Sequence, residues 1–192
     1  MKKQILTGTN LSELERAYDK IMVWFFAFPD AEFTLNELCK NLKIAKTTAN
    51  IVVSAFEKRD FLTHHVLGKV WRIRANASHA FFTTHKIPFN LKSVYESGVL
   101  QWINSNIPGA RAVVLFGSYR KGDDTEKSDV DIAVEVIRDN EQEIIPLQIA
   151  RMGYRVNVPL NIHVFSRNKI DLNLFANIAN GILLQGFLEV RP

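Results

Sequence analysis

The sequence of 192 residues has very little cysteine and no long apolar run. Its single cysteine, Cys39, excludes an intramolecular disulfide and indicates a reducing compartment. The longest apolar run, Ile21–Phe28, stops at Pro29, well short of the roughly 20 residues that cross a bilayer. The basic start, Met1–Lys3, leads into polar residues and not into the apolar core of a signal peptide. We therefore expect a cytoplasmic protein with no membrane partner, in which Cys39 is a buried structural thiol.

Hydrophobic residues make up 47% of the chain and charged residues 23%, which is typical of a globular protein with a substantial core. The net charge of +4 is unevenly distributed. Residues 1–96 hold 14 Lys and Arg against 9 Asp and Glu, whereas residues 97–192 hold 10 against 11. A nucleic-acid partner is therefore expected first in the first half, although an ordinary solvated basic surface explains the surplus equally well.

The first half has the pattern of three helices followed by a β-hairpin. Thr34 and Glu37 precede an apolar run with the spacing of a capping box, which predicts the start of the second helix. After Asp60 the apolar period changes to two, and Gly68-Lys69 is a typical hairpin turn. The predicted helices cover residues 11–28, 34–41 and 46–59, and the predicted strands cover residues 61–67 and 70–74.

This order resembles a winged helix-turn-helix domain, which we assign to residues 1–76, followed by a linker at residues 77–91. The resemblance implies that the third helix presents polar side chains to base edges and that the hairpin meets phosphates. The candidate DNA-binding residues are Lys46, Thr47, Thr48 and Asn50 on the helix, and Lys69, Arg72 and Arg74 on the hairpin. Because these residues can make only a few phosphate contacts, a monomer is expected to bind DNA weakly. Specific recognition would then need a homodimer. A partner protein on the same surface is the alternative.

Residues 92–192 alternate predicted helices and strands. The helices are expected at residues 91–105, 141–152 and 172–184, and the strands at residues 112–116, 130–137 and 160–165. The sequence therefore predicts an α+β protein, in which a winged helix-turn-helix domain precedes a small domain with helices packed on a short mixed sheet.

The chemistry is concentrated in Gly117-Ser118 and, after ten intervening residues, Asp129-Val130-Asp131. Alternate side chains of a strand share a face, so Asp129 and Asp131 are expected to point the same way. Two adjacent carboxylates repel each other unless a cation lies between them, and Mg²⁺ characteristically takes one or two carboxylates plus substrate phosphates. The bland alternative is that the two aspartates merely begin a strand and that Gly117-Ser118 merely makes a turn.

Gly117-Ser118 and the loop that follows them have the composition of a phosphate-binding loop. Glycine at Gly117 lets the backbone approach a phosphate, and the hydroxyl of Ser118 can donate to it. Arg120, Lys121 and Lys127 can offset the charge of a triphosphate. We therefore expect these five residues to bind a nucleotide.

Together these features resemble the signature of the DNA polymerase β-like nucleotidyltransferase superfamily, and residues 95–188 resemble its small "minimal" members. The resemblance implies transfer of a nucleoside monophosphate from an NTP to a hydroxyl, with Mg²⁺ or Mn²⁺ held by Asp129 and Asp131. Active members have a third carboxylate on the next strand, where this sequence has Asn161. His163 shares its strand face and could replace it as a base, although a lone strand histidine is more often structural.

Three functions remain open on the sequence alone. The chain could be a nucleotidyltransferase whose acceptor is a protein, a nucleic acid or a small molecule. It could instead be a DNA-binding regulator with a degenerate domain that senses nucleotide, or an antitoxin-like partner of another protein. The intact aspartate pair favours the first function, whereas Asn161 favours the other two.

Overall fold

The computed structural model describes residues 11–68, 70–137 and 142–190 and divides the chain into two compact units, Met1–His79 and Ala80–Pro192. The division falls inside the expected linker at residues 77–91. Among the residues described, no helix combines the length and the apolar character that a membrane crossing requires. The two units are described separately below.

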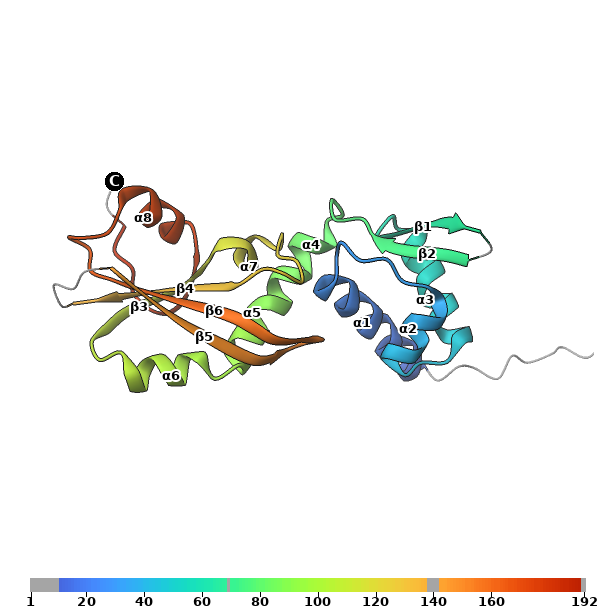
Figure 1. The fold of residues 1–192 in the computed structure, drawn as a ribbon, viewed down its shortest axis with the longest axis horizontal. Helices are drawn as coiled ribbons and strands as arrows, with labels where there is room; N and C mark the ends of the chain where they lie inside the picture. Colours follow the sequence, from blue (N-terminus) through green and yellow to red (C-terminus); the bar gives the residue numbers. More distant parts are fainter. Residues whose placement is uncertain (1–10, 69, 138–141, 191–192) are drawn as a thin grey trace, which may run out of the picture. The chain divides into compact units, whose positions relative to one another are not determined.

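The described residues of the first unit form three helices and a two-stranded antiparallel sheet, in the predicted order (Figure 1). Its elements are α1 (Leu11–Ala27), α2 (Leu35–Leu42), α3 (Lys46–Glu57), β1 (Leu62–Leu67) and β2 (Val70–Ala75). The order agrees with the sequence pattern, whereas the assignment as a winged helix-turn-helix domain stays a prediction.

Local signals account for the ends of α2. The backbone N–H of Thr34 donates to Glu37 Oε2 at 2.6 Å, and the N–H of Glu37 donates to Thr34 Oγ1 at 3.1 Å, so the predicted capping box is confirmed. Lys43 ends the helix in the left-handed region, with φ 53°. Cys39 is half-buried, so its expected full burial is not found, although burial raises the pKa of its thiol.

An aromatic core holds the first unit together. Phe25, Phe26, Phe56 and Phe61 are each at most 1% exposed. The rings of Phe56 and Phe61 meet edge to face with centroids 4.9 Å apart, a geometry that adds to the gain from burial. The core of this unit is therefore almost entirely apolar.

In the second unit, the described residues form a five-stranded mixed sheet with helices on both faces. Its helices are α4 (Phe81–Thr84), α5 (Lys86–Glu96), α6 (Val99–Asn106), α7 (Gly117–Lys121) and α8 (Leu172–Ala179). Its strands are β3 (Ala110–Phe116), β4 (Val130–Val136), β5 (Glu143–Met152), β6 (Arg155–Phe165) and β7 (Ile182–Gly186). The strand order is β5-β6-β4-β3-β7, in which β4 and β6 are parallel and the other pairs are antiparallel. This agrees with the predicted α+β class and its mixed sheet.

Each face of this sheet has its own apolar cluster. On one face, Val94 of α5 and Ile103 of α6 pack against residues of the central strands such as Ile132. On the other face, Ile178 of α8 packs against a smaller cluster that includes Phe116. Figure 1 shows α6 and α8 on opposite sides of the sheet. The second cluster leaves part of its face free for polar side chains.

The predicted helix at residues 141–152 is wrong, because residues 143–152 form the edge strand β5; residue 141 lies outside the described residues. The apolar spacing there fits a period of two as well as a helix, and the sheet selects the strand. Leu147 and Ile149 point toward the core, whereas Gln148 is exposed between them. Pro146, inside the run, disfavours a helix and is tolerated in an edge strand.

Two other predicted helices have different limits. The helix predicted to reach residue 184 ends at Ala179, and β7 follows. Gly181 allows the chain to approach β3 closely at this point, since a Cβ on residue 181 would lie only 2.4 Å from Val114 Cγ1. The helix predicted at residues 91–105 is two helices, separated at Gly98 with φ 82°. The expected linker is itself helical, since α4 and the first half of α5 lie within it.

Candidate metal and nucleotide site

The candidate site forms where β3, β4 and β6 lie side by side. In the sheet register, Asp131 of β4 pairs with Phe116 of β3 on one side and with Asn161 of β6 on the other. His163 lies one step further along the same face, opposite Ala133. The strand pairing therefore brings residues 116, 131 and 161 together, although they are far apart in the sequence.

The two carboxylates meet at one amide. Asn161 Nδ2 lies 3.1 Å from Asp129 Oδ2 and 3.4 Å from Asp131 Oδ1, and donates to both. All three side chains are half-buried. Two carboxylates so close to one atom create a local negative charge that a divalent cation would neutralise.

Asn161 occupies the position expected for a third carboxylate and changes what the site can do. Its amide carries no charge and cannot accept a proton from a substrate hydroxyl. In the observed orientation its nitrogen faces the two aspartates, whereas a rotation about the last side-chain bond would present its carbonyl oxygen to a cation instead. The site thus offers two charged side chains and one neutral side chain to a cation.

His163 is a neighbour of the aspartates and is held in place. Its Nε2 lies 3.4 Å from Asp131 Oδ1, and its ring meets the ring of Phe116 edge to face at 5.0 Å. Its Nδ1 is buried and has no hydrogen-bond partner among the residues described. Nε2 thus contacts a carboxylate and Nδ1 is enclosed, an arrangement that fits a structural histidine.

Gly117 is the residue whose lack of a side chain the site requires. Its φ of 71° lies in the left-handed region, and a Cβ there would lie 2.7 Å from Asp131 Oδ2. Any larger residue would push on the carboxylate. Ser118 follows directly and is half-buried at the start of α7.

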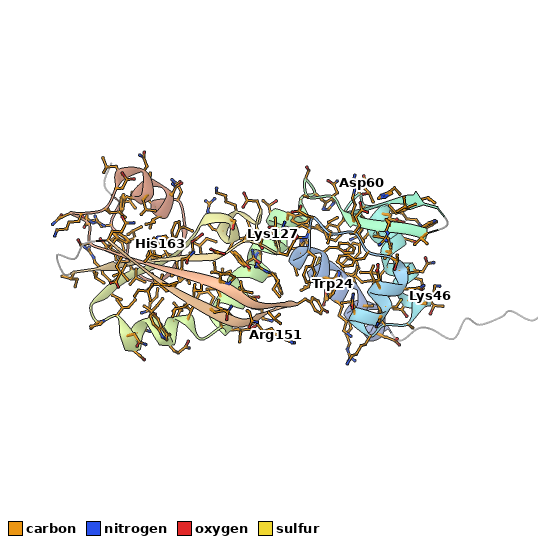
Figure 2. The ribbon with its side chains drawn as sticks, in the orientation of Figure 1. Trp24, Lys46, Asp60, Lys127, Arg151 and His163 are labelled. Carbon is orange, nitrogen blue, oxygen red and sulfur yellow. The ribbon has the colours of Figure 1, made fainter. Side chains whose placement is uncertain are left out.

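The basic residues of the loop are available to an anion. Arg120 is half-buried, and Lys121 and Lys127 are exposed. Among the described residues none of these three side chains forms a salt bridge or hydrogen bond. Figure 2 labels Lys127, in the loop between α7 and β4, and His163, on β6. Their positive charges therefore remain free to offset phosphates.

A buried polar network that sequence reasoning missed fixes the loop between the motifs. Lys86 of α5 is 0% exposed and forms an ion pair with Asp124 of the loop at 3.3 Å, and it also donates to the Asp124 carbonyl. Asn90 Nδ2 donates to Asp124 Oδ1 at 2.7 Å and to the Tyr119 carbonyl at 3.1 Å. Burial lowers the pKa of Lys86 and raises that of Asp124, and the attraction between them opposes both shifts. A lone lysine inside an expected linker gave no signal of this role.

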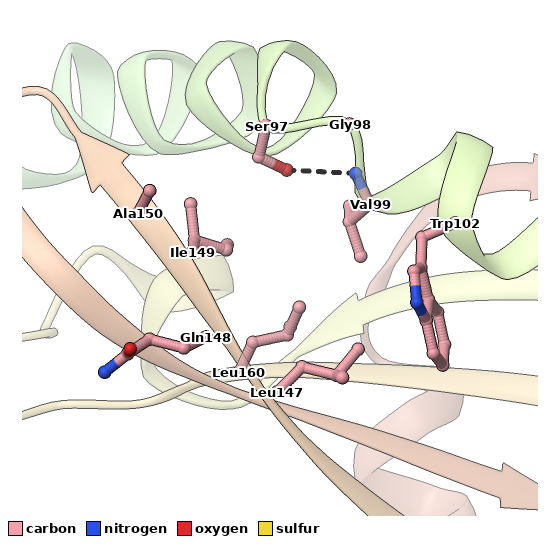
Figure 3. Close-up of a pocket in the computed structure, with 9 residues that line it drawn as sticks. All are labelled: Ser97, Gly98, Val99, Trp102, Leu147, Gln148, Ile149, Ala150 and Leu160. Atoms are coloured by element: carbon pink, nitrogen blue, oxygen red, sulfur yellow. Dashed lines mark hydrogen bonds between the residues drawn. The ribbon is translucent and has the colours of Figure 1, made fainter.

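A cavity of about 470 Å³ lies on the opposite face of the sheet, between α6 and β5 (Figure 3). Leu160, which lines it, precedes Asn161 in β6 and therefore points away from the aspartates. Trp102 and Ile149 contribute to its apolar wall, and no ionisable side chain lines it. The chemistry is therefore assigned to the aspartate face and not to this cavity.

The candidate DNA-binding residues of the first unit differ in exposure. Lys46, Thr47 and Asn50 are exposed at the start of α3. Thr48 was expected to point outward, and this is wrong: it is 3% exposed. The reason is helical spacing, since Thr48 is next to buried Ala49 and four residues before buried Val52.

The hairpin is less basic in effect than its sequence suggests. Arg74 is exposed, whereas Arg72 is half-buried and lies 3.7 Å from Glu37 Oε2. Lys69 lies outside the described residues. Four large apolar side chains around the turn are between 47% and 63% exposed: Val66, Leu67, Val70 and Trp71. Partners that offer apolar surface fit this hairpin as well as phosphates do.

The fold and the site together describe a small α+β domain that has a glycine-serine turn and two aspartates at the centre of a mixed sheet. Residues 100–186 match the family model described as Polymerase beta, Nucleotidyltransferase. The matched range includes every residue of the candidate site from Gly117 to His163, and it supports the DNA polymerase β-like superfamily for this part of the chain. No curated protein matches the sequence significantly.

The match suggests a function of the nucleotidyltransferase type, in a family that usually uses a divalent metal. Among the residues described, no group of three or more His, Cys, Asp and Glu side chains is arranged to hold a metal ion. The donor set nevertheless fits Mg²⁺, which needs only one or two carboxylates when substrate phosphates and waters complete its shell. Asp129 and Asp131 are the residues that would hold it.

Proposed function

We propose that the second unit binds an NTP with one divalent cation at Asp129 and Asp131, and transfers its nucleoside monophosphate to a hydroxyl acceptor. The observation that carries the proposal is the convergence of both carboxylates on Asn161, beside a glycine where a Cβ would lie 2.7 Å from Asp131 Oδ2. The cation would neutralise charge on the phosphates and polarise the attacked phosphorus centre.

The chain's own residues have distinct tasks in this proposal. Ser118 donates its hydroxyl to a terminal phosphate, and Arg120, Lys121 and Lys127 offset the triphosphate charge. The acceptor oxygen forms a bond to the α-phosphorus, the bond from that phosphorus to the bridging oxygen breaks, and pyrophosphate leaves. Asn161 cannot take the acceptor's proton, so that proton passes to an aspartate carboxylate or to water.

Titration with Mn²⁺ and each of the four NTPs tests the binding step. We expect Asp129→Asn and Asp131→Asn each to weaken Mn²⁺–NTP affinity by at least about 100-fold, because even residues that only support metal ligands cost about 10- to 100-fold. Asp123→Asn is the matched control, since Asp123 is an exposed carboxylate of the same loop. Equal affinity in the wild type and both site variants would show that nucleotides bind elsewhere.

The transfer step needs its own measurement. Incubation with NTPs labelled at the α-phosphate, with protein, RNA and small-molecule acceptors, should give labelled product that depends on Asp131. If binding is present and no label is transferred, Asn161→Asp decides why: restored transfer would identify the missing carboxylate as the cause.

A second candidate is a regulator whose nucleotidyltransferase-like unit senses nucleotide, and Asn161 is the observation that favours it. In this reading the first unit, as a winged helix-turn-helix domain, contacts DNA through Lys46, Thr47 and Asn50, and a homodimer provides two half-sites. Anisotropy with mixed duplex DNA at low salt tests it. We expect affinity to fall in Lys46→Ala and to decrease by about 0.9 log units per log unit of salt for each phosphate neutralised.

Failure to bind DNA at tens of micromolar would favour binding of another protein by the first unit. This chain would then be the antitoxin-like partner of that protein. The exposed apolar side chains of the hairpin support that outcome. Trp71→Ser should then weaken the protein complex and leave nucleotide binding by the second unit unchanged.

A further inference from the structure

Arg155, at the start of β6, is a buried charged residue of the second unit. Among the described residues, the other buried charged side chains of this unit form salt bridges, whereas Arg155 forms none. It is 8% exposed and stands directly after the turn that joins β5 to β6, where Gly153 has φ 57°. A two-residue turn of this kind fixes the direction in which the second strand begins. The Arg155 backbone is therefore held in place independently of the nucleotide site.

Its guanidinium makes three hydrogen bonds to two separate segments. Nη1 donates to the hydroxyl of Tyr119, and the guanidinium carbon lies 5.7 Å from the centre of the Tyr119 ring. Nη2 donates to the carbonyl of Ser128 at 2.8 Å and to the carbonyl of Glu126 at 3.0 Å. None of these acceptors is a carboxylate, so the contacts constrain geometry and do not neutralise charge.

The positions of these acceptors in the chain carry the inference. Tyr119 directly follows Ser118, and Ser128 directly precedes Asp129. One planar group thus links the residue beside the expected phosphate ligand to the residue beside the expected metal ligand. The planar guanidinium presents its donors in fixed directions, which an ammonium cannot reproduce.

We propose that Arg155 is a positioning residue that fixes Ser118 and Asp129 relative to each other and so prepares the site for a metal-bound triphosphate. The role in nucleotide binding rests on the proposed function, whereas the link between the two segments does not. Arg155 contacts neither carboxylate and acts only through Tyr119 and Ser128.

Hydrogen exchange of the full chain without nucleotide tests the link. Arg155→Met should increase amide exchange at residues 117–122 and 127–131 by at least about 10-fold, because both segments lose their shared anchor. Arg151→Met is the matched control: Arg151 is an exposed arginine at the end of β5, labelled in Figure 2, and its replacement should change neither segment. Unchanged exchange in Arg155→Met would overturn the proposal.

Affinity for Mn²⁺ and ATP together tests the consequence. Arg155→Met and Arg155→Lys should both weaken it by about 10- to 100-fold, the range found when support for a metal ligand is removed. Met152→Ala truncates a buried residue of the same hairpin and controls for general loss of stability. It should keep its affinity at temperatures well below its unfolding transition. Wild-type affinity in Arg155→Lys would overturn the geometric role.

Two further results separate the possibilities. If Arg155→Met does not fold, Tyr119→Phe removes a single acceptor and should loosen residues 117–122 while residues 127–131 stay protected. Equal loosening of both segments would contradict the link. If the wild type binds no Mn²⁺–ATP but exchange responds as expected, the proposed function fails and the positioning by Arg155 stands.

Discussion

The two units differ in where they bury polar side chains. Among the described residues of the first unit only Thr48 is both polar and buried, whereas the second unit buries six such residues: Lys86, Asn90, Asp124, Glu135, Arg155 and Ser166. Burial of an unpaired polar group is costly, so polar groups that are buried in a fold are normally paired. Three of the six, Lys86, Asn90 and Asp124, bond to one another around the loop between the two site motifs, and Arg155 holds both ends of that loop.

The comparison indicates different designs. The first unit uses an aromatic core to support a surface whose polar residues are exposed. The second unit uses its interior to hold a loop in one conformation. Fixed geometry is what a metal and triphosphate require, since ligands displaced by an ångström bind poorly.

The largest expected effect comes from breaking the buried pair of the second unit. Lys86→Met leaves Asp124 buried without its partner and should cost about 3–5 kcal/mol of the free energy of unfolding. The double variant Lys86→Met/Asp124→Leu should recover part of that loss, because no charge then remains buried. Denaturant unfolding followed by hydrogen exchange reports the two units separately. A double variant as unstable as the single one would show that the pair is not the source of the cost.

The next effect distinguishes two glycines in the same backbone region. Gly117→Ala and Gly68→Ala both place a side chain at positive φ, with φ 71° and 66°, and each should cost about 1–3 kcal/mol. Only Gly117→Ala adds a Cβ against Asp131, since nothing lies within 4 Å of the Gly68 position. We expect calorimetry to show weaker Mn²⁺–NTP binding for Gly117→Ala alone. The same loss in both variants would remove the special role of Gly117.

A smaller effect concerns the capping box of the first unit. Thr34→Ala should lower the free energy of unfolding by about 1 kcal/mol, while Thr47→Ala, on an exposed helix position, should change little. The Thr34 backbone N–H, which donates to the Glu37 carboxylate, holds the pKa of Glu37 below its usual range.

A carboxyl group with a lowered folded-state pKa stabilises the fold above its ordinary pKa, and that contribution is lost as pH falls through the folded value. The stability difference between the wild type and Glu37→Gln should therefore shrink in acid. A difference that grows as the pH falls would contradict the cap.

The smallest expected effect comes from the buried polar residue of the first unit, compared with one of the second unit. Thr48→Val removes the hydroxyl of Thr48, the buried polar residue among the described residues of the first unit. It should change stability by no more than about 1 kcal/mol, because no described side chain depends on that hydroxyl. Asn90→Leu in the second unit should cost more, since Asp124 and the Tyr119 carbonyl both lose a donor. Equal losses would mean that the buried polar groups of the two units do not differ in importance.

Local signals in the sequence predicted much of this fold. The capping box at Thr34 and the turn at Gly68 have short-range causes and were found where expected. The prediction of a helix at residues 141–152 was wrong because the apolar spacing there suits a helix and a strand equally well. Pairing with β6 selects the strand. The edge strand β7 was missed for the same reason, since its partner β3 lies about 70 residues earlier, a separation typical of non-local sheet contacts.

The site shows the same limit. The alternation of Asp129 and Asp131 and the glycine before Ser118 are readable because strand geometry is periodic. The supporting residues Lys86, Asn90 and Arg155 come from elements whose approach to the loop depends on the complete sheet. A single arginine after a turn carries no local pattern that distinguishes it from a solvated one, such as Arg151.

The parallel pairing of β4 with β6 also bears on when the site can exist. Asp131 is the neighbour of Asn161 only after the chain has passed through β5 and returned, and contacts so distant in sequence form more slowly than local ones. On a ribosome, the aspartates would therefore emerge well before the strand that completes their surroundings. The proposed nucleotide binding would begin only once synthesis had passed the end of β6, so the appearance of affinity during translation would report pairing of β4 with β6.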